Sequence, residues 1–479
     1  MSSLTDFIVQ TYLFYDLETS GLSPCFDQVY QFAAIRTDMD LKELERYEFI
    51  VKPTIDVIPS IQASVTHRLS MERLENEGMP EHEAIFKIHQ LLNTPGTISL
   101  GYNTLTFDDE FLRFNFYRHL LTPYTHQFAN QCRRMDLFPM VVFYYLGRQD
   151  HLKWGLRNDK VSLKLEDLSL ENHLSDGPAH NAMVDVAATV QLARRLKEDT
   201  KMWESLLGCF VKNEDLLRLG KLPLVDVGGV SYPMGLAVNG RFGVAKSYQV
   251  PVLGLGQHWH YANQTIWLNL DDERILSGDE ALIPELWSTK KKPAEPPFIM
   301  QPKAPFDMIN DERKALVAET LKFLQLNQGF FKAIQDYMLD FKFPVYQETD
   351  LDAKLYHLPF LQDQDVYTMR QFWQSEANAR VDCISRFRQQ ELQQLGWRFM
   401  GRFYPEALPS ERKKEFDDYI ARIWAHEVSN VADYQMKPHL TRFEALRQVE
   451  ETDLTDLDDE QKAVLASVKA YLQKSVALE

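Results

Sequence analysis

The residue pattern of this 479-residue chain changes twice, near residues 199 and 350. Up to residue 198, short apolar runs typical of strands alternate with helical spacing, as in Tyr12–Glu18 and His82–Leu92. From 199 to 350, glycines among β-branched and aromatic residues predict a β-rich barrel or sheet. After 350, glycine is rare and amphipathic runs such as Lys413–Trp424 predict helices. We therefore expect three domains, residues 1–198, 199–350 and 351–479, of which the first is an α/β layer fold.

Residues 290–305 have a different composition from their surroundings. They contain five prolines and the run Lys290-Lys291-Lys292. Proline lacks a backbone donor and runs of like charge are usually solvated, so we expect an exposed loop or linker here.

The overall composition is that of a soluble cytoplasmic protein. Isolated cysteines indicate a reducing compartment, and all four cysteines are isolated in sequence: Cys25, Cys132, Cys209 and Cys383. Residues 1–7 lack a signal-peptide pattern, and the longest apolar stretch, Pro139–Leu146, is far shorter than the roughly 20 residues that cross a membrane. A net charge of -17 disfavours a broadly basic surface. A nuclease with carboxylates around metal ions, however, needs only a local basic track.

Two acids end the first strand-like run. Asp16 and Glu18 are two residues apart, so in a strand they project from the same face and repel each other. A divalent cation between them converts this repulsion into chelation by oxygen ligands. Such a triplet is common by chance, so this interpretation depends on acids elsewhere.

A second group of acids follows the strand candidate Thr97–Tyr102. In Phe107-Asp108-Asp109-Glu110-Phe111, acids open a helical stretch, and helix capping with dipole pairing explains Asp109 and Glu110. We expect Asp108 to be the acid whose carboxylate points toward the end of the sheet.

The third element is His180 followed five residues later by Asp185. Asp185 falls beside an apolar helical stripe, where a carboxylate is costly unless it is paired or binds a metal. A lone histidine is more often structural. Here it precedes an acid that needs a partner, and imidazole can deprotonate water near neutral pH.

In order and spacing, the D-x-E, F-D-D-E and H-x-x-x-x-D elements resemble the DEDD exonuclease superfamily in its histidine-containing branch. The stretches Gln31–Asp38 and Asp352–Tyr356 are similar to the bacterial exonuclease I family, so the resemblance spans nearly the whole chain. It implies a ribonuclease-H-like nuclease domain, then a barrel resembling the SH3 fold and a helical C-terminal domain.

The resemblance also implies roles for these residues. His180 would be the general base. Two Mg²⁺ ions, for which Mn²⁺ can substitute, would be held by four carboxylates: Asp16, Glu18, Asp108 and Asp185. The implied reaction removes 5′-mononucleotides from the 3′ end of single-stranded DNA, in DNA repair or recombination. Besides Glu18, the expected substrate contacts are Arg113, Tyr124, Phe128 and Lys164. Lys164 stands where the family usually has an arginine. Arg113 and Lys164 are each equally well interpreted as solvated helix residues.

Most aromatic residues in such a chain belong to the core. Further candidates for stacking or phosphate contacts nevertheless lie downstream: Lys246, Tyr248, Trp259 and Trp267. His67 lies in Val65–Ser70, where related nucleases often have a glycine in a turn. We interpret it as a loop residue rather than a ligand.

The implied partners are single-stranded DNA and the acidic C-terminal tail of single-stranded-DNA-binding protein, and we expect a monomer without membrane association. An exoribonuclease with the same five residues is an alternative, because metal chemistry at phosphate does not distinguish the two sugars. Another is a catalytically inactive scaffold that binds single strands, although such a protein does not need all five residues. A small-substrate phosphatase would make little use of two further large domains.

Overall fold

The computed structural model of the chain describes residues 8–175, 181–304, 306–424 and 429–474. The chain divides into two compact units. The first comprises residues 1–134, 176–187 and 345–479, and the second comprises residues 135–175 and 188–344. Each unit is therefore assembled from segments that are far apart in sequence.

A five-stranded sheet forms the centre of the first unit, in the order β3-β2-β1-β4-β5. β1 pairs antiparallel with β2, which pairs antiparallel with β3, whereas β4 is parallel to β1 and β5 is parallel to β4. The strands span Thr11–Thr19 (β1), Val29–Thr37 (β2), Glu43–Ile50 (β3), Thr97–Leu100 (β4) and Arg133–Arg134 (β5). β2 is buried along its whole length, as expected for an interior strand rich in apolar residues.

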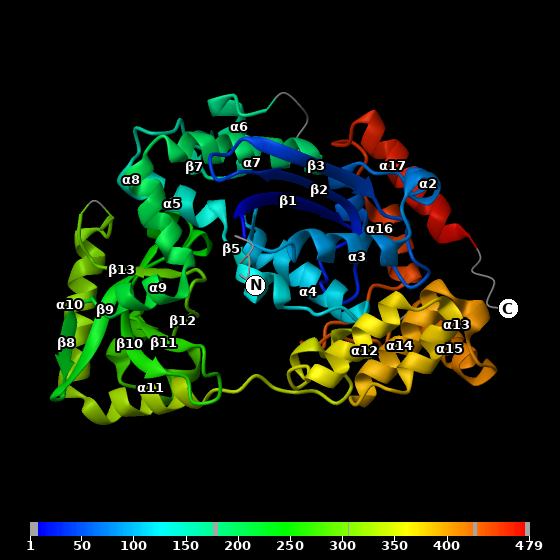
Figure 1. Cartoon of the computed structure of the whole chain (residues 1–479). Helices are drawn as coiled ribbons and strands as arrows, with labels where there is room; N and C mark the ends of the chain where they lie inside the picture. The colour runs from blue at the N-terminus through cyan, green and yellow to red at the C-terminus, as the bar shows by residue number, and fades with distance from the viewer. Residues whose placement is uncertain (1–7, 176–180, 305, 425–428, 475–479) are drawn as a thin grey trace, which may run out of the picture. The chain divides into compact units, whose positions relative to one another are not determined.

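Helices cover one face of this sheet (Figure 1). Leu13, Tyr15 and Leu17 of β1 share a hydrophobic core with Ile85 of α3 and Phe111 of α4. Because side chains alternate along a strand, Asp16 and Glu18 project from the opposite face. This core includes residues of α3 (Glu81–Leu92) and α4 (Asp108–Arg118), whereas α1 (Ile61–His67) and α2 (Met71–Glu77) contribute to a core shared with the C-terminal helices. This arrangement confirms the predicted α/β, ribonuclease-H-like fold.

The C-terminal part of the first unit is helical, as predicted. After the 3₁₀ turn Leu351–Tyr356 come α12 (Asp363–Gln374), α13 (Ala377–Ile384), α14 (Gln390–Phe403), α15 (Ser410–Trp424), α16 (Arg442–Glu451) and α17 (Asp459–Gln473). The side chain of Arg402 of α14 is 2% exposed and donates to Asp56 at 2.6 Å and to Asp352. These charge-assisted bonds hold the pKa of Asp56 well below its usual range against the effect of burial.

The second unit contains an antiparallel sheet in the order β12-β11-β10-β9-β13, with β8 paired to β9. Its strands are Leu224–Val227 (β8), Val230–Val238 (β9), Gln249–Gln257 (β10), Thr265–Asn269 (β11), Ser288–Lys291 (β12) and Phe298–Met300 (β13). The sheet agrees with the predicted SH3-like barrel. Two helices that the composition did not indicate pack against it: α10 (Asp311–Leu326) and α11 (Gln328–Asp340).

The remaining elements of the second unit precede this sheet in sequence. They are α5 (Leu137–Gly147), the hairpin β6–β7 (Gly155–Arg157 and Lys160–Ser162), α6 (Leu165–Asn172), most of α7 (Ala182–Lys197), α8 (Thr200–Leu207) and α9 (Lys212–Leu219). In the part of the chain that the structure describes, no helix is long and apolar enough to cross a membrane.

The prediction of an exposed loop or linker at residues 290–305 was wrong. β12 ends at Lys291, and β13 lies within the same segment. Lys291 is fully buried, and its Nζ donates to Asp215 at 2.6 Å and to the carbonyl oxygens of Lys292 and Glu295. A lysine can lie in a core when its ammonium group is paired and hydrogen-bonded in this way, and composition does not reveal the distant partner.

Candidate active site

Strand β1 presents two acids on the face that α3 and α4 leave uncovered. Asp16 lies opposite Ala33 of β2 and Glu18 lies opposite Gln31, and a register irregularity follows Glu18. Gly101, after β4, allows the next loop to approach this strand, because a Cβ there would lie 2.5 Å from the Tyr15 carbonyl oxygen. The predicted placement of both acids on one face is confirmed.

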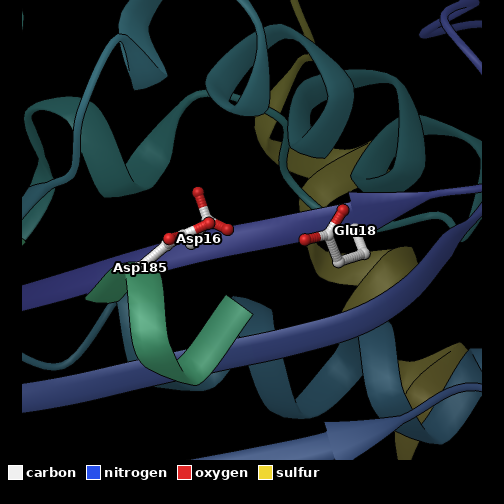
Figure 2. Close-up of side chains that lie close together, drawn as sticks. All are labelled: Asp16, Glu18 and Asp185. Atoms are coloured by element: carbon white, nitrogen blue, oxygen red, sulfur yellow. The ribbon is translucent and has the colours of Figure 1, made fainter. Parts of the chain in front are cut away.

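Asp185 joins these acids from the first turn of α7. Asn181 caps this helix by accepting hydrogen bonds from the backbone amides of Met183 and Val184. Ligand atoms of Asp16, Glu18 and Asp185 all lie within 4.8 Å of one another. Figure 2 shows Asp185 directed toward Asp16, with Glu18 further along the same strand.

The pKa values of these carboxyls show the cost of gathering them. Burial, followed by repulsion from Asp108, Glu18 and Asp185, raises the pKa of Asp16 well above its ordinary range. Burial, followed by repulsion from Asp185 and Asp108, raises the pKa of Glu18 to about 8. A divalent cation would remove this repulsion, and the donors are the hard oxygen ligands that Mg²⁺ and Mn²⁺ prefer. The residues therefore fit a divalent metal.

Asp108 begins helix α4 and is buried. Among the neighbouring charges, it contributes most to the raised pKa of Asp16 and also contributes to that of Glu18, so its carboxylate acts electrostatically on both acids of β1. The assignment of Asp108 rather than its neighbours to the site agrees with this placement.

The next residue, Asp109, belongs to a network that the sequence interpretation missed. Its carboxylate, 1% exposed, accepts hydrogen bonds from Arg134 of β5 and from His126 at 3.0 Å, and Arg113 lies at 3.3 Å. Burial alone would raise the pKa of Asp109, but the arginines hold it well below its usual range. Helix capping was therefore the wrong interpretation of Asp109, because its carboxylate pairs with other side chains. Arg113 is four residues away on the same helix, whereas no local sequence signal identifies Arg134 and His126.

Glu110 also differs from the capping interpretation. Its carboxylate accepts hydrogen bonds from the hydroxyls of Tyr356 and Tyr434, each at 3.1 Å. Glu110 thus joins the first turn of α4 to the C-terminal part of the same unit.

The other predicted site residues are placed as follows. His180 lies outside the described residues. Lys164 precedes α6 in the second unit, with a 64% exposed side chain and its Nζ 3.7 Å from Glu166. Arg113 contacts Asp109, as described above. Tyr124 and Phe128 line a cavity of about 560 Å³ together with Tyr356 and Phe360, and Phe128 is 69% exposed.

The downstream candidates divide into core and surface. Tyr248 and Trp267 are buried in the second unit, Trp259 is exposed, and Lys246 lies over the ring of Trp287. His67 is the buried last residue of α1, not a loop residue, and its Nδ1 accepts a hydrogen bond from the Leu69 amide.

Comparison with known proteins places this site in a family. The exonuclease family model matches residues 13–193, and the model of the exonuclease I C-terminal domain matches residues 349–475. Exodeoxyribonuclease I of Escherichia coli K12 is 33% identical over 281 residues, which is 58% of this chain and 56% of that protein. Exodeoxyribonuclease I of Buchnera aphidicola (subsp. Baizongia pistaciae) is 33% identical over 266 residues, 54% of this chain and 53% of the relative. The chain thus spans about half the length of the curated relatives it matches.

The solved structures extend the likeness of fold to nearly the whole chain. The crystal structure of E. coli exonuclease I in complex with a dA16 oligonucleotide superposes with a TM-score of 0.83 at 24% identity, covering 96% of this chain and 99% of that one. The sheet with its carboxylate cluster lies within the part of the chain that matches the exonuclease family model. Residues 349–475 resemble the exonuclease I C-terminal domain, so the chain is similar to exonuclease I proteins in both of these regions.

Proposed function

We propose that this protein is an exodeoxyribonuclease that degrades single-stranded DNA from its 3′ end and releases 5′-mononucleotides. The cluster of Asp16, Glu18 and Asp185 within 4.8 Å carries the proposal. Burial, followed by repulsion from Asp185 and Asp108, raises the pKa of Glu18 to about 8, which is unfavourable in a purely structural site but favours binding of divalent cations.

In the proposed mechanism, Asp16, Glu18, Asp108 and Asp185 would hold two Mg²⁺ ions, for which Mn²⁺ could substitute. When bound, such ions would supply Lewis-acid chemistry, which polarises the scissile phosphate and lowers the pKa of the attacking water. His180 accepts the proton of that water. The hydroxyl of the water bonds to phosphorus as the bond from phosphorus to the 3′ oxygen breaks, leaving a 5′-mononucleotide and a strand with a new 3′ hydroxyl.

The preference for single-stranded DNA is supported by the relatives and by the cavity at Tyr124. The named relatives are exodeoxyribonucleases, and one solved relative holds a dA16 oligonucleotide. Tyr124 and the exposed Phe128 offer ring faces on which unpaired bases can stack. Tyr356 lines the same cavity and donates to Glu110, two residues after Asp108, so the cavity lies near the start of α4.

We further propose the three-domain division at residues 198 and 350, which the extents of the two family models support. A monomer in the cytoplasm is the proposed state, and four free, buried cysteines suit a reducing compartment. Arg113 and Lys164 are proposed phosphate contacts. Docking of the acidic tail of single-stranded-DNA-binding protein is proposed from the family resemblance.

The substrate is tested with 3′- and 5′-labelled single-stranded DNA, duplex DNA and RNA, each with Mg²⁺ and with chelator. We expect release of 5′-mononucleotides from the 3′ end of single-stranded DNA, only when Mg²⁺ is present. Release from RNA but not from DNA would identify an exoribonuclease, and no release from any substrate would favour a binding scaffold.

The site is tested with Asp185→Ala, which removes one of the three clustered carboxylates. We expect turnover to be abolished while binding of single-stranded DNA, measured by fluorescence anisotropy, stays within about threefold of the unmodified protein. Glu83→Ala, an exposed acid on α3, is the matched control and should keep full activity. Full activity in Asp185→Ala would contradict the metal assignment.

A further inference from the structure

A cavity of about 700 Å³ adjoins the carboxylate cluster in the first unit. Gln31, in its lining, lies directly opposite Glu18 in the antiparallel pair β1–β2, and such side chains are neighbours on one face of a sheet. Asn181, also in the lining, caps the helix that carries Asp185. The volume is within the range of roughly 300–1,000 Å³ that small-molecule sites occupy. Under the proposed function, this cavity receives the terminal nucleotide of the strand.

The outer wall of this cavity combines the α1–α2 turn with the start of α17. Thr66 and His67 come from the end of α1 and Arg68 comes from the turn that follows it, and Glu460 and Gln461 come from the C-terminal helix. The C-terminal helix therefore forms part of a cavity beside the carboxylates of β1.

Arg68 adopts a conformation that favours glycine. It ends α1 with φ 61° and ψ 17°, in the left-handed region, where a side chain with a Cβ is strained. Its guanidinium is 2.7 Å from Asp458 and 2.9 Å from Glu460, at the start of α17. These ion pairs are largely solvated, so they contribute little to the free energy of unfolding, and the backbone strain opposes that contribution.

The residues that meet Arg68 lie at a helix start that is closed by a capping box. Asp458 caps α17 by accepting a hydrogen bond from the Gln461 backbone amide. The Asp458 backbone amide in turn donates a hydrogen bond to the side-chain Oε1 of Gln461. Gln461 also donates to the Val65 carbonyl oxygen at 3.3 Å. The helix end thus offers a fixed point to which the turn is attached.

We propose that Arg68 is a positioning residue that attaches the α1–α2 turn to α17, so that the C-terminal helix sets the width of the nucleotide cavity. This inference rests on the proposed function. The ion pairs are largely solvated and contribute little to stability, so their main consequence is the position of the turn. Loosening the turn should weaken substrate binding without changing the carboxylates that act on the phosphate.

The test is the double variant Asp458→Asn/Glu460→Gln, which removes both ion pairs while keeping a residue that can cap α17. We expect KM for a short single-stranded oligonucleotide to rise about fivefold, with kcat within twofold and the melting temperature within about 2 °C. Inhibition by 5′-dTMP should weaken by the same factor. Arg68→Gly should show the same change in KM without loss of thermal stability, because glycine relieves the strain.

The matched control is Glu75→Gln, which removes the ion pair between α2 and Lys474 just after α17 but does not alter the cavity lining. It should leave KM unchanged. If the unmodified protein degrades single-stranded DNA but the double variant keeps its KM, the inference is overturned while the proposed function stands. A double variant with a much lower melting temperature and a lower kcat would also overturn it, because the ion pairs would then have a general structural role. An inactive unmodified protein would instead refute the proposed function.

Discussion

Without divalent metal, the carboxylate cluster should make this protein less stable as the pH rises. Glu18 has an ordinary pKa of 4.5 in the unfolded chain and a pKa of about 8 in the folded protein. Between these two values, the folded protein keeps a proton that the unfolded chain has lost. The free energy of unfolding therefore falls as the pH rises through this window, and below it the penalty is absent.

The size of the effect follows from the pKa difference. At about 1.4 kcal/mol per pKa unit, ionising Glu18 in the folded protein costs on the order of 5 kcal/mol above pH 8. For a unit of this size, 1 kcal/mol shifts the melting temperature by roughly 2 °C. Because Glu18 keeps some contact with solvent, we expect a fall of about 5–10 °C between pH 5 and pH 8.5 from this group.

The assay is differential scanning fluorimetry across this pH range, with EDTA or with Mg²⁺, on the unmodified protein and on Glu18→Gln. At pH 5 the two proteins should melt within about 2 °C of each other, because the protonated carboxyl resembles the amide. At pH 8.5 in EDTA, Glu18→Gln should melt about 5–10 °C higher, and Mg²⁺ should close this gap by stabilising the unmodified protein.

Glu83→Gln serves as the control and should follow the unmodified protein at every pH, since Glu83 is exposed on α3. An equal difference between Glu18→Gln and the unmodified protein at pH 5 and pH 8.5 would refute the reasoning. So would stabilisation by Mg²⁺ that is no greater at pH 8.5 than at pH 5.

Three further substitutions test individual residues. His180→Ala should lower kcat by about 10²-fold or more if His180 is the general base, and single-turnover kinetics showing a change of less than twofold would remove it from that role. Asp109→Asn should weaken Mn²⁺ binding in calorimetry, because the network that fixes the start of α4 beside Asp108 loses its charge; unchanged affinity would make the network purely structural. Lys291→Met should destabilise the second unit by about 3 kcal/mol or more, because Asp215 loses a buried partner, and an unchanged chemical-denaturation midpoint would contradict the buried pairing.

Much of the site could be predicted because its key signals are local. Asp16 and Glu18 share a face since a strand alternates its side chains, and Asp185 stands out because a carboxylate beside an apolar helical stripe needs a partner. Asp109 was misinterpreted for the opposite reason. Its position at a helix start suits capping, whereas its observed partners, Arg134 and His126, reach it only through the fold.

The C-terminal helices illustrate the same division. Their amphipathic spacing is visible in the sequence, so the helical character after residue 350 was predicted correctly. Their membership of the same compact unit as the sheet was not predicted. It depends on contacts such as that of Arg402 with Asp56, between residues far apart along the chain.

The sequence by itself determined the mixed strand and helix character of residues 1–198, the helical character after residue 350, and the position of two acids on one face of β1. These properties depend on the spacing of apolar side chains over a few residues. Only the tertiary structure decided that Asp185 lies within 4.8 Å of both acids, that Lys291 is buried against Asp215, and that Arg68 meets the start of α17. Such pairs form when the packing of whole elements brings distant side chains together, and their spacing in sequence carries no record of that approach.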